Sequence, residues 1–587
     1  NRIHTVYQEV GLLRDLRRGD FDGNKLITMP DGLGECTALT QLNVAGNGLE
    51  ALPESMVNHT LLTALDVSSN NLRMLPTGIG LCKDLEDFEF DDNPFDSIPK
   101  EILKQGPKVL IDYLSRFCAA GPPPGYEKKV GAFNGKTRRL VLDGLQLEHV
   151  PPYVYGLGYL EGLSCRRNSI VSLPPEVSLL RNLVFLSLES NLLRSLPLEL
   201  CLCPLEELEL LFNTWEEPPQ EVRDRGCKVI LQYLQAQYLA LKTGVLDIRN
   251  CFLEHLPPEI QRLAGPEMHT IEMSGNLVEQ LPNLRPLCYT KEFKIGYNRL
   301  KTLPDSIRLL TSLTSLHVPG NLLSQLPLTF VHLTALLTLN LDANKFTSIP
   351  SVVCRVSSLT QLSVCNNRVA VLDGEVGMLQ QLREIRLAGN GMHTVCDELC
   401  DATELKIVDL SNNNLETLPG GACAPGHFER LSCLESLDLR GNMLSVLPTG
   451  LGMLYETLTD LKYDDYELSQ LPSEILEEGT EGVILYLRLC HETLEHKCLD
   501  LTGKQLQEVP SHIGQMLHLE EIRLSHNHVT ELPDWIGNLK ALRVLRLDHT
   551  GIRSLPLGLC DCSMLQMVDL DGLSLLSPPK QILSKGV

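Results

Sequence analysis

Pairs of histidines that lie a few residues apart in this chain could bind a metal ion if their spacing matched that of known metal sites. His491 and His496 lie five residues apart, whereas a helical metal site places its two histidines four apart so that both share one face. His526 and His528 flank Asn527, and we expect both to be surface residues. The sequence therefore predicts no metal-binding residue.

Other patterns in the chain fall short of an active site. Residues 130–137 approach a phosphate-binding loop, but Val130 stands where the first glycine belongs, and the segment precedes a predicted strand at 140–142 instead of following one. Two Cys-x-Cys pairs, which begin at Cys201 and Cys560, lack the second pair that a structural zinc site needs. No serine elbow, kinase signature or dinucleotide fingerprint occurs. We predict that the protein is not an enzyme and uses no cofactor.

The elements that must position any functional residue come from one pattern, which is copied along most of the chain and is complete in residues 336–358. Leu339 and Leu341 alternate as in a strand that buries one face, Asn344 follows, and a looser or helical return segment begins after Pro350. One such coil cannot bury its own leucines, whereas a stack of coils can. The pattern is a leucine-rich repeat, and it predicts an α/β repeat solenoid.

Aligning the chain on Asn344 predicts about 22 coils, and we call the aligned residue of each coil the asparagine position. Asparagine fills 16 of these positions, where its amide can bond to the backbones of adjacent buried coils. The positions are Asn24, Asn47, Asn70, Asn93, Leu145, Asn168, Asn191, Asn213, Cys251, Asn276, Asn298, Asn321, Asn344, Asn367, Asn390, Asn413, Asn442, Tyr466, Lys504, Asn527, Thr550 and Leu573.

A second pattern interrupts the coils three times and predicts helical caps within the chain. It contains a glycine four residues after an isoleucine or valine, and a Tyr-Leu pair that begins seven residues after the glycine. The glycines are Gly106, Gly226 and Gly479, and the tyrosines are Tyr113, Tyr233 and Tyr486. The predicted regions are block 1 with an N-terminal helix and a cap (1–117), a Pro/Gly-rich linker (118–137), block 2 with a cap (138–242), block 3 with ten repeats and a cap (243–495), and block 4 with a truncated cap (496–587).

Composition limits the partners that this chain can have. The formal net charge is −23 and the pI is near 5.2, which argues against nucleic acid or an anionic membrane surface and favours proteins with a basic surface. No apolar run reaches the length of a membrane helix. The 19 cysteines are an odd number and are dispersed along the chain, so we expect reduced thiols and a cytoplasmic protein, with association to the cytoskeleton as an option.

The exposed side of the strands is where we expect binding. In each coil the residue four before the asparagine position lies between two inward leucines and should point outward. Acidic residues dominate this row, and the aromatic Phe212, Trp215 and Tyr297 lie near it. The predicted protein-binding residues are Asp66, Glu89, Asp247, Glu272, Lys294, His317, Arg386, Asp409, Asp438, Lys462, Arg523 and Arg546. The ten coils from Asp247 to Lys462 offer the largest continuous surface.

The repeat form Leu-x-x-Leu-x-Leu-x-x-Asn-x-Leu-x-x-Leu-Pro, with Leu-Pro in most coils as at Leu303-Pro304 and Leu532-Pro533, resembles intracellular leucine-rich repeat proteins of the Ras-scaffold type and the plant Ras-group proteins. That resemblance implies a curved solenoid with a parallel β-sheet on its concave face, acting as an adaptor in signalling or in a large assembly.

Three functions are compatible with this sequence. The first is a non-catalytic scaffold that binds proteins on the concave face, as part of a larger complex. The second is the regulatory repeat region of a larger enzyme, such as a kinase, GTPase or cyclase. The third is a structural component of a cytoskeletal or ciliary complex.

Overall fold

The computed structural model describes residues 3–96, 98–119, 138–419, 427–464, 468 and 471–577. The backbone alone is described for residues 117–119 and 153. The chain forms two compact units, Asn1–Leu253 and Glu254–Val587. Most of the predicted linker at 118–137, and the predicted start of a truncated cap at the C-terminal end, lie outside the described residues.

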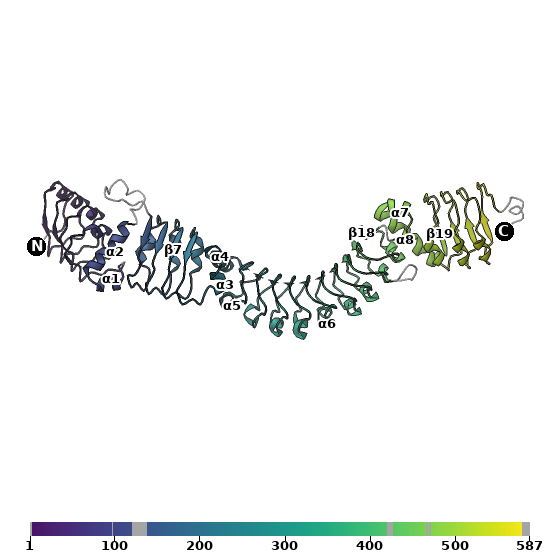
Figure 1. Cartoon of the computed structure of the whole chain (residues 1–587), viewed down its shortest axis with the longest axis horizontal. Coiled ribbons are helices and arrows are strands. Elements are labelled where there is room, and N and C mark those ends of the chain that lie inside the picture. The colour runs from purple at the N-terminus through teal and green to yellow at the C-terminus, as the bar shows by residue number, and fades with distance from the viewer. Residues whose placement is uncertain are drawn as a thin grey trace. The chain divides into compact units, whose positions relative to one another are not determined.

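The first unit contains two four-stranded parallel sheets and two pairs of α-helices (Figure 1). Its strands are β1 (Arg18–Asp20), β2 (Gln41–Asn43), β3 (Ala64–Asp66), β4 (Asp87–Glu89), β5 (Arg139–Val141), β6 (Gly162–Ser164), β7 (Phe185–Ser187), β8 (Glu207–Glu209) and β9 (Val245–Asp247). Its α-helices are α1 (Lys100–Lys104), α2 (Pro107–Ala119), α3 (Gln220–Arg223) and α4 (Cys227–Thr243). Its 3₁₀-helices are η1 (Gln8–Leu12), η2 (Asp31–Glu35), η3 (Glu54–Asn58), η4 (Thr77–Leu81), η5 (Pro152–Gly156), η6 (Pro175–Leu179) and η7 (Leu198–Leu202).

The second unit contains one long run of parallel strands, a helix pair and a final four-stranded parallel sheet. Its strands are β10 (Thr270–Glu272), β11 (Glu292–Lys294), β12 (Ser315–His317), β13 (Thr338–Asn340), β14 (Gln361–Ser363), β15 (Glu384–Arg386), β16 (Ile407–Asp409), β17 (Ser436–Asp438), β18 (Asp460–Lys462), β19 (Cys498–Asp500), β20 (Glu521–Arg523), β21 (Val544–Arg546) and β22 (Met567–Asp569). Its α-helices are α5 (Pro258–Leu263), α6 (Ser351–Cys354), α7 (Ser473–Glu477) and α8 (Gly479–His496). Its 3₁₀-helices are η8 (Arg285–Leu287), η9 (Asp305–Leu309), η10 (Leu328–His332), η11 (Gly374–Met378), η12 (Asp397–Asp401), η13 (Phe428–Arg430), η14 (Thr449–Leu454), η15 (Ser511–Gln515), η16 (Asp534–Asn538) and η17 (Leu557–Asp561).

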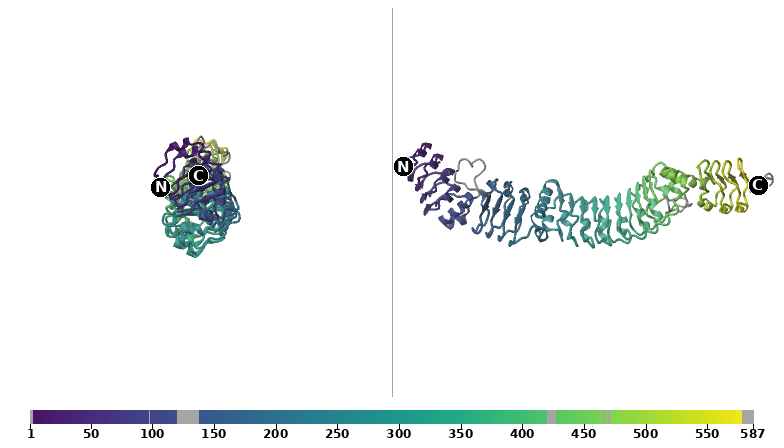
Figure 2. Two further views of the ribbon diagram at one scale, coloured as in Figure 1. Left: turned by 90° about the vertical axis from the view of Figure 1, so that its left-hand side faces the viewer. Right: turned by 45° about the horizontal axis from the view of Figure 1, so that its top comes forward.

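Each coil repeats the same packing, with a short strand on one side and a helical segment on the other (Figure 2). In the coil of β13, Leu339 and Leu341 are buried and Phe346 lies behind them. The strand pairs in register with its neighbour, so that Leu339 lies opposite Leu362. The apolar residues of all coils therefore form one continuous core behind each sheet.

The asparagine position joins neighbouring coils through buried hydrogen bonds. Nδ2 of Asn344 donates to the carbonyl oxygen of Val318 in the preceding coil at 2.9 Å, and to Leu341 and Asp342 in its own coil at 3.0 Å each. Its Oδ1 accepts a hydrogen bond from the backbone amide of Leu323 at 3.0 Å. This is the ladder that the sequence predicts, because one side chain satisfies backbone groups that burial hides from water.

The three predicted caps are present as pairs of helices. Glycines with positive φ stand at their junctions, at +87° for Gly106, +84° for Gly226 and +73° for Gly479, in a region that other residues rarely adopt. The tyrosines of the pattern, which are Tyr113, Tyr233 and Tyr486, are buried. The predicted helix, glycine and helix sequence is therefore confirmed at all three places.

Two caps depend on glycines that let the cap helix approach the last coil closely. A Cβ atom on Gly80, in η4, would lie 2.2 Å from the backbone nitrogen of Ser115 in α2. A Cβ atom on Gly452, in η14, would lie 2.1 Å from the backbone nitrogen of Arg488 in α8. Since both neighbours are backbone atoms of a helix, they cannot move aside alone.

We expect Gly452→Ala to lower the free energy of unfolding by about 1 to 3 kcal/mol, because the added methyl forces α8 and η14 apart. Chemical denaturation of the intact chain measures this change. Gly391→Ala is the matched control, because a Cβ atom there meets no other atom within 4 Å. Equal midpoints for the two variants would contradict the close packing of the cap.

The predicted N-terminal helix is wrong. Residues 3–7 have no regular secondary structure; η1, a five-residue 3₁₀-helix, follows, and then β1, in which Arg18 lies opposite Gln41 of the next coil. The segment is therefore a coil of the solenoid and not a capping helix. Apolar residues three or four apart, such as Val6, Val10 and Leu13, fit a 3₁₀ return segment as well as an α-helix.

Candidate protein-binding surface

Three positions of each coil point outward from the strands, where the sequence analysis considered one. They lie two, four and six residues before the asparagine position, and we call them together the strand face. In the coil of Asn344 they are Thr338, Asn340 and Asp342, which are partly exposed on either side of the buried Leu339. Neighbouring strands bring the same positions of successive coils side by side.

Most charges of the strand face from β9 to β18 are paired within their own coil. The ion pairs, with their shortest N–O distances, are Arg249 with Asp247 (2.7 Å), Lys294 with Glu292 (2.7 Å), Arg386 with Glu384 (2.5 Å), Arg440 with Asp438 (2.6 Å) and Lys462 with Asp460 (2.7 Å). Hydrogen bonds from these cations lower the pKa values of Asp247, Glu292 and Asp460 below their ordinary range. The predicted acidic row is therefore neutralised locally over much of its longest stretch.

The other predicted binding residues between β9 and β18 form hydrogen bonds with a backbone amide or a nearby serine hydroxyl. Glu272 accepts a hydrogen bond from the amide of Ser274 at 3.0 Å. Asp409 accepts one from the amide of Ser411 at 3.0 Å and one from its hydroxyl at 2.7 Å. His317 lies 2.8 Å from the hydroxyl of Ser315, and burial lowers the pKa of its imidazole. These three side chains have structural partners, which limits their freedom to rearrange around a ligand.

The last sheet and the sheet of β5 to β8 pair some of their charges. In the last sheet Arg523 lies 2.7 Å from Glu521 and 3.3 Å from Asp500, and Arg546 lies 3.2 Å from the same Glu521. The hydrogen bond from Arg523 lowers the pKa of Glu521. In the sheet of β5 to β8, Arg166 forms ion pairs with Glu189 of the next coil and with Glu209 of the coil after that.

The first sheet differs in the pairing of its strand-face acids. Six carboxylates occupy its strand face, and we call them the acidic face: Asp20, Asp22, Asp66, Asp87, Glu89 and Asp91. Among the residues that the structure describes, none of the six forms an ion pair. Asp20, Asp66, Asp87 and Glu89 line a shallow depression of about 190 Å³ together with Arg18. This part of the solenoid therefore presents dense negative charge to solvent.

The predicted aromatic residues divide into two groups. Phe212 and Tyr297 are 79% and 68% exposed, and each stands with positive φ directly before an asparagine position. Trp215 instead donates from Nε1 to the carbonyl oxygen of Leu210 at 3.0 Å and stacks against Arg223. Phe212 and Tyr297 are available to a partner, whereas Trp215 supports its own loop.

The register places the predicted binding residues beside one another across the strands. The adjacent pairs are Asp66 with Glu89, Glu272 with Lys294, Lys294 with His317, Arg386 with Asp409, Asp409 with Asp438, Asp438 with Lys462, and Arg523 with Arg546. The positions two and six before the asparagine position, which supply the neutralising partners, were not among the predicted binding residues. The alternation of the strand was a sufficient signal for them, since residues two apart share a face.

Many thiols among the described residues are buried in the core, where they act as small apolar side chains. Every cysteine whose side chain the structure describes is free. Burial raises the pKa of Cys203 to about 11 and those of Cys354 and Cys400 to about 12. A thiol that stays protonated at neutral pH is a poor nucleophile and metal ligand.

Short parallel strands, an asparagine ladder and helical return segments define a leucine-rich repeat solenoid. Two segments match family models for this repeat: residues 380–444 match the model described as leucine rich repeat, and residues 518–539 match a second model of the same description. The chain therefore has the leucine-rich repeat fold. No curated protein matches the sequence.

Several solved structures are similar to this chain. A leucine-rich repeat protein of Leptospira interrogans is 23% identical with a TM-score of 0.33, and the match covers 79% of this chain and 93% of that protein. The ectodomain of the plant membrane receptor kinase GASSHO1/SCHENGEN3 from Arabidopsis thaliana, solved in complex with CASPARIAN STRIP INTEGRITY FACTOR 2, is 21% identical with a TM-score of 0.36, covering 97% and 66%. No helix within the described residues of this chain is long and apolar enough to span a membrane.

Proposed function

We propose that this protein is a non-catalytic scaffold that binds partner proteins on its strand face, and that the acidic face of β1 to β4 receives a basic segment of one partner. The observation that carries this proposal is the set of six carboxylates without ion-pair partners among the described residues. Elsewhere on the strand face, nine of the eighteen acids form ion pairs within the described residues. A cytoplasmic location, where the free thiols stay reduced, belongs to the same proposal.

The dimensions of the acidic face favour an extended basic segment as its ligand. Neighbouring strands are about 4.8 Å apart, so four strands span roughly 15 Å, which matches a few residues of extended chain. The depression is shallow and polar, and its floor is made of strand backbone and short side chains such as Asn43 and Ala64. Lysine and arginine side chains can reach such carboxylates without entering a pocket, and clustered opposite charge accelerates encounter.

The strand face from β10 to β18 supports the proposal as a second, larger contact area. Its paired charges are partly exposed, and Tyr297 projects beside them. A partner protein can contact this neutralised surface through shape and aromatic contact. Each unit of the chain can be tested for its own contribution by mutation.

Reversing two charges of the acidic face tests its role in binding. We expect Asp87→Lys combined with Glu89→Lys to slow association of a fluorescent oligolysine peptide about tenfold at low ionic strength, because the carboxylates that attract the peptide are replaced by like charges. Stopped-flow mixing at increasing salt measures the rate, and the dependence on salt should weaken in the variant.

The matched control reverses two carboxylates outside the strand face, Asp31→Lys and Glu35→Lys in η2, which change the net charge by the same amount. Both residues are exposed. An equal loss of rate in the two variants would mean that net charge alone attracts the peptide, and would remove the acidic face as a specific site.

A further inference from the structure

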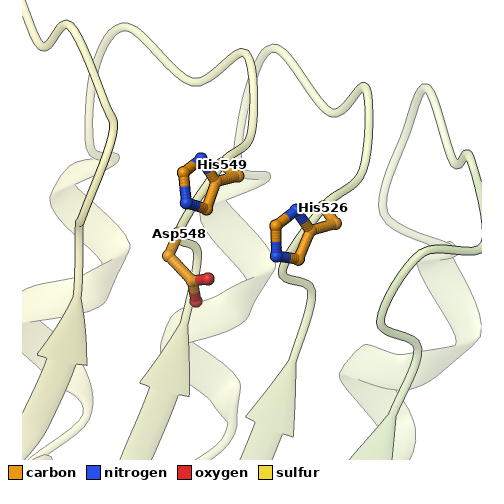
Figure 3. Close-up of side chains that lie close together, drawn as sticks. All are labelled: His526, Asp548 and His549. Atoms are coloured by element: carbon orange, nitrogen blue, oxygen red, sulfur yellow. The ribbon is translucent and has the colours of Figure 1, made fainter.

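Two histidines and one aspartate gather at the carboxyl ends of the two central strands of the last four-stranded sheet. His526 follows β20, and Asp548 and His549 follow β21 (Figure 3). One possible ligand atom from each of the three residues lies within 4.8 Å of the other two. The imidazole rings are stacked, with centroids 4.6 Å apart and planes inclined by 11°.

The backbone of the solenoid brings the two histidines together. Each stands directly before an asparagine position with positive φ, +58° at His526 and +54° at His549. The amide of His526 donates to the carbonyl oxygen of Asp548 at 3.0 Å, which ties the two coils together at this point. The side chains therefore leave equivalent points of neighbouring coils in the same direction, although 23 residues separate them in the sequence.

The space beside the pair is open because glycines occupy the same position in the coils on either side. Gly503 precedes them and Gly572 follows them, both with positive φ. A Cβ atom on Gly572 would lie 3.0 Å from Nδ1 of His549, and one on Gly503 would meet nothing within 4 Å. A side chain larger than glycine at position 572 would crowd the ring nitrogen, whereas glycine leaves room for a ligand there.

The aspartate is oriented by a neighbour that is not itself a ligand. Oδ1 of Asp548 accepts a hydrogen bond from the hydroxyl of Ser525, the residue before His526. Hydrogen bonds of this kind fix the direction of a carboxylate and are a common support of metal ligands. Asp548 is half-buried while both histidines are exposed, so the rings can turn and the carboxylate is held.

We propose that His526, Asp548 and His549 bind a divalent transition metal ion of the zinc, cobalt and nickel class. Two imidazoles and one carboxylate are suitable ligands for such ions, with metal–nitrogen bonds of about 2.0 to 2.1 Å. Tetrahedral donors are then roughly 3.4 Å apart, so the exposed rings turn out of the stack to point their lone pairs at one centre. The fourth position stays open to water or to a donor group of a bound protein. The site lies on a different sheet from the acidic face and is independent of the proposed function.

Cobalt(II) titration of the intact chain, with its thiols kept reduced, tests this site. Visible absorption reports the coordination of the ion, and equilibrium dialysis reports its affinity and stoichiometry. We expect His526→Ala and His549→Ala each to weaken cobalt binding at this site at least tenfold, and Asp548→Asn to weaken it while keeping an acceptor for Ser525. Cobalt should also raise the unfolding temperature of the parent protein more than that of these variants.

The control is His528→Ala, which removes an exposed histidine two residues from His526 that is not part of the cluster. This variant should bind cobalt like the parent. The proposal is overturned if the parent shows no saturable cobalt site, or if removal of His526 and of His549 leaves the affinity unchanged. It is equally overturned if His528→Ala weakens binding as much as the cluster variants do.

Discussion

Replacing Asn344 by alanine is expected to lower the free energy of unfolding by about 3 to 5 kcal/mol, because each buried polar group that loses its partner costs about 1 to 3 kcal/mol. The substitution removes the bonds to the carbonyl oxygens of Val318 and Leu341 and the bond from the amide of Leu323. Those groups are buried between coils, where water cannot replace the amide.

The stability of a solenoid is local, so the measurement should report single coils as well as the whole chain. Chemical denaturation gives the overall loss, and amide hydrogen exchange should show faster opening at Leu323 and at the neighbouring coils. Asn340→Ala is the control in the same coil. Its side chain accepts one bond, from the amide of Asp342 at 2.9 Å, at a half-exposed site, so we expect a loss of about 1 kcal/mol or less. Equal losses of unfolding free energy in the two variants would contradict a stabilising role for the hydrogen bonds of Asn344 between coils.

Leu341→Ala is expected to cost about 2 to 5 kcal/mol, because it leaves a cavity in the middle of the longest run of coils. Leu341 is fully buried. Its neighbours in the core belong to the adjacent coils, and the backbone of three-residue strands joined on both sides cannot close over the gap. The unfolding midpoint in denaturant measures the loss.

Leu337→Ala is the matched control, since it deletes the same atoms from a leucine that is 43% exposed. We expect its cost to stay below about 1 kcal/mol, because less apolar surface returns to water and no cavity forms. A control variant as destabilised as Leu341→Ala would contradict the assignment of Leu341 to the core and of Leu337 to the surface.

The fold was predictable because its signals are repeated. Leu339, Leu341 and Asn344 recur in coil after coil, so chance matches at single positions do not obscure the period. The caps were predictable for a different reason: a left-handed junction needs glycine, and a buried tyrosine at a constant distance from it marks the second helix, as Gly226 and Tyr233 show. The N-terminal segment has no such repetition, and its apolar spacing suited two kinds of helix.

The binding surface was predictable in position but not in charge. Alternation places Asp438 on the strand face, but only the structure shows that Arg440 neutralises it. Pairing of this kind depends on which side-chain rotamers the neighbouring coils permit. The sequence did not predict the cluster of His526 and His549, because the pair considered there was His526 with the nearby His528. Aligning the coils would have revealed it, since both clustered histidines directly precede an asparagine position.

Recovery of partner proteins by the intact chain tests most directly whether the acidic face is a docking site. The parent is compared with a strand-face variant, Asp66→Asn, Asp87→Asn and Glu89→Gln. An outer variant, which removes three exposed carboxylates elsewhere, carries Asp31→Asn, Glu35→Gln and Glu50→Gln. Asparagine at position 66 keeps an oxygen for Ser68, whose amide and hydroxyl bond to Asp66 at 3.0 and 2.7 Å, so the fold is preserved.

We predict that a partner with a basic segment is retained by the parent and by the outer variant and is lost from the strand-face variant. Quantitative mass spectrometry of the three recovered complexes measures this difference. Retention of every partner by the strand-face variant, or equal loss from both variants, would contradict docking at the acidic face.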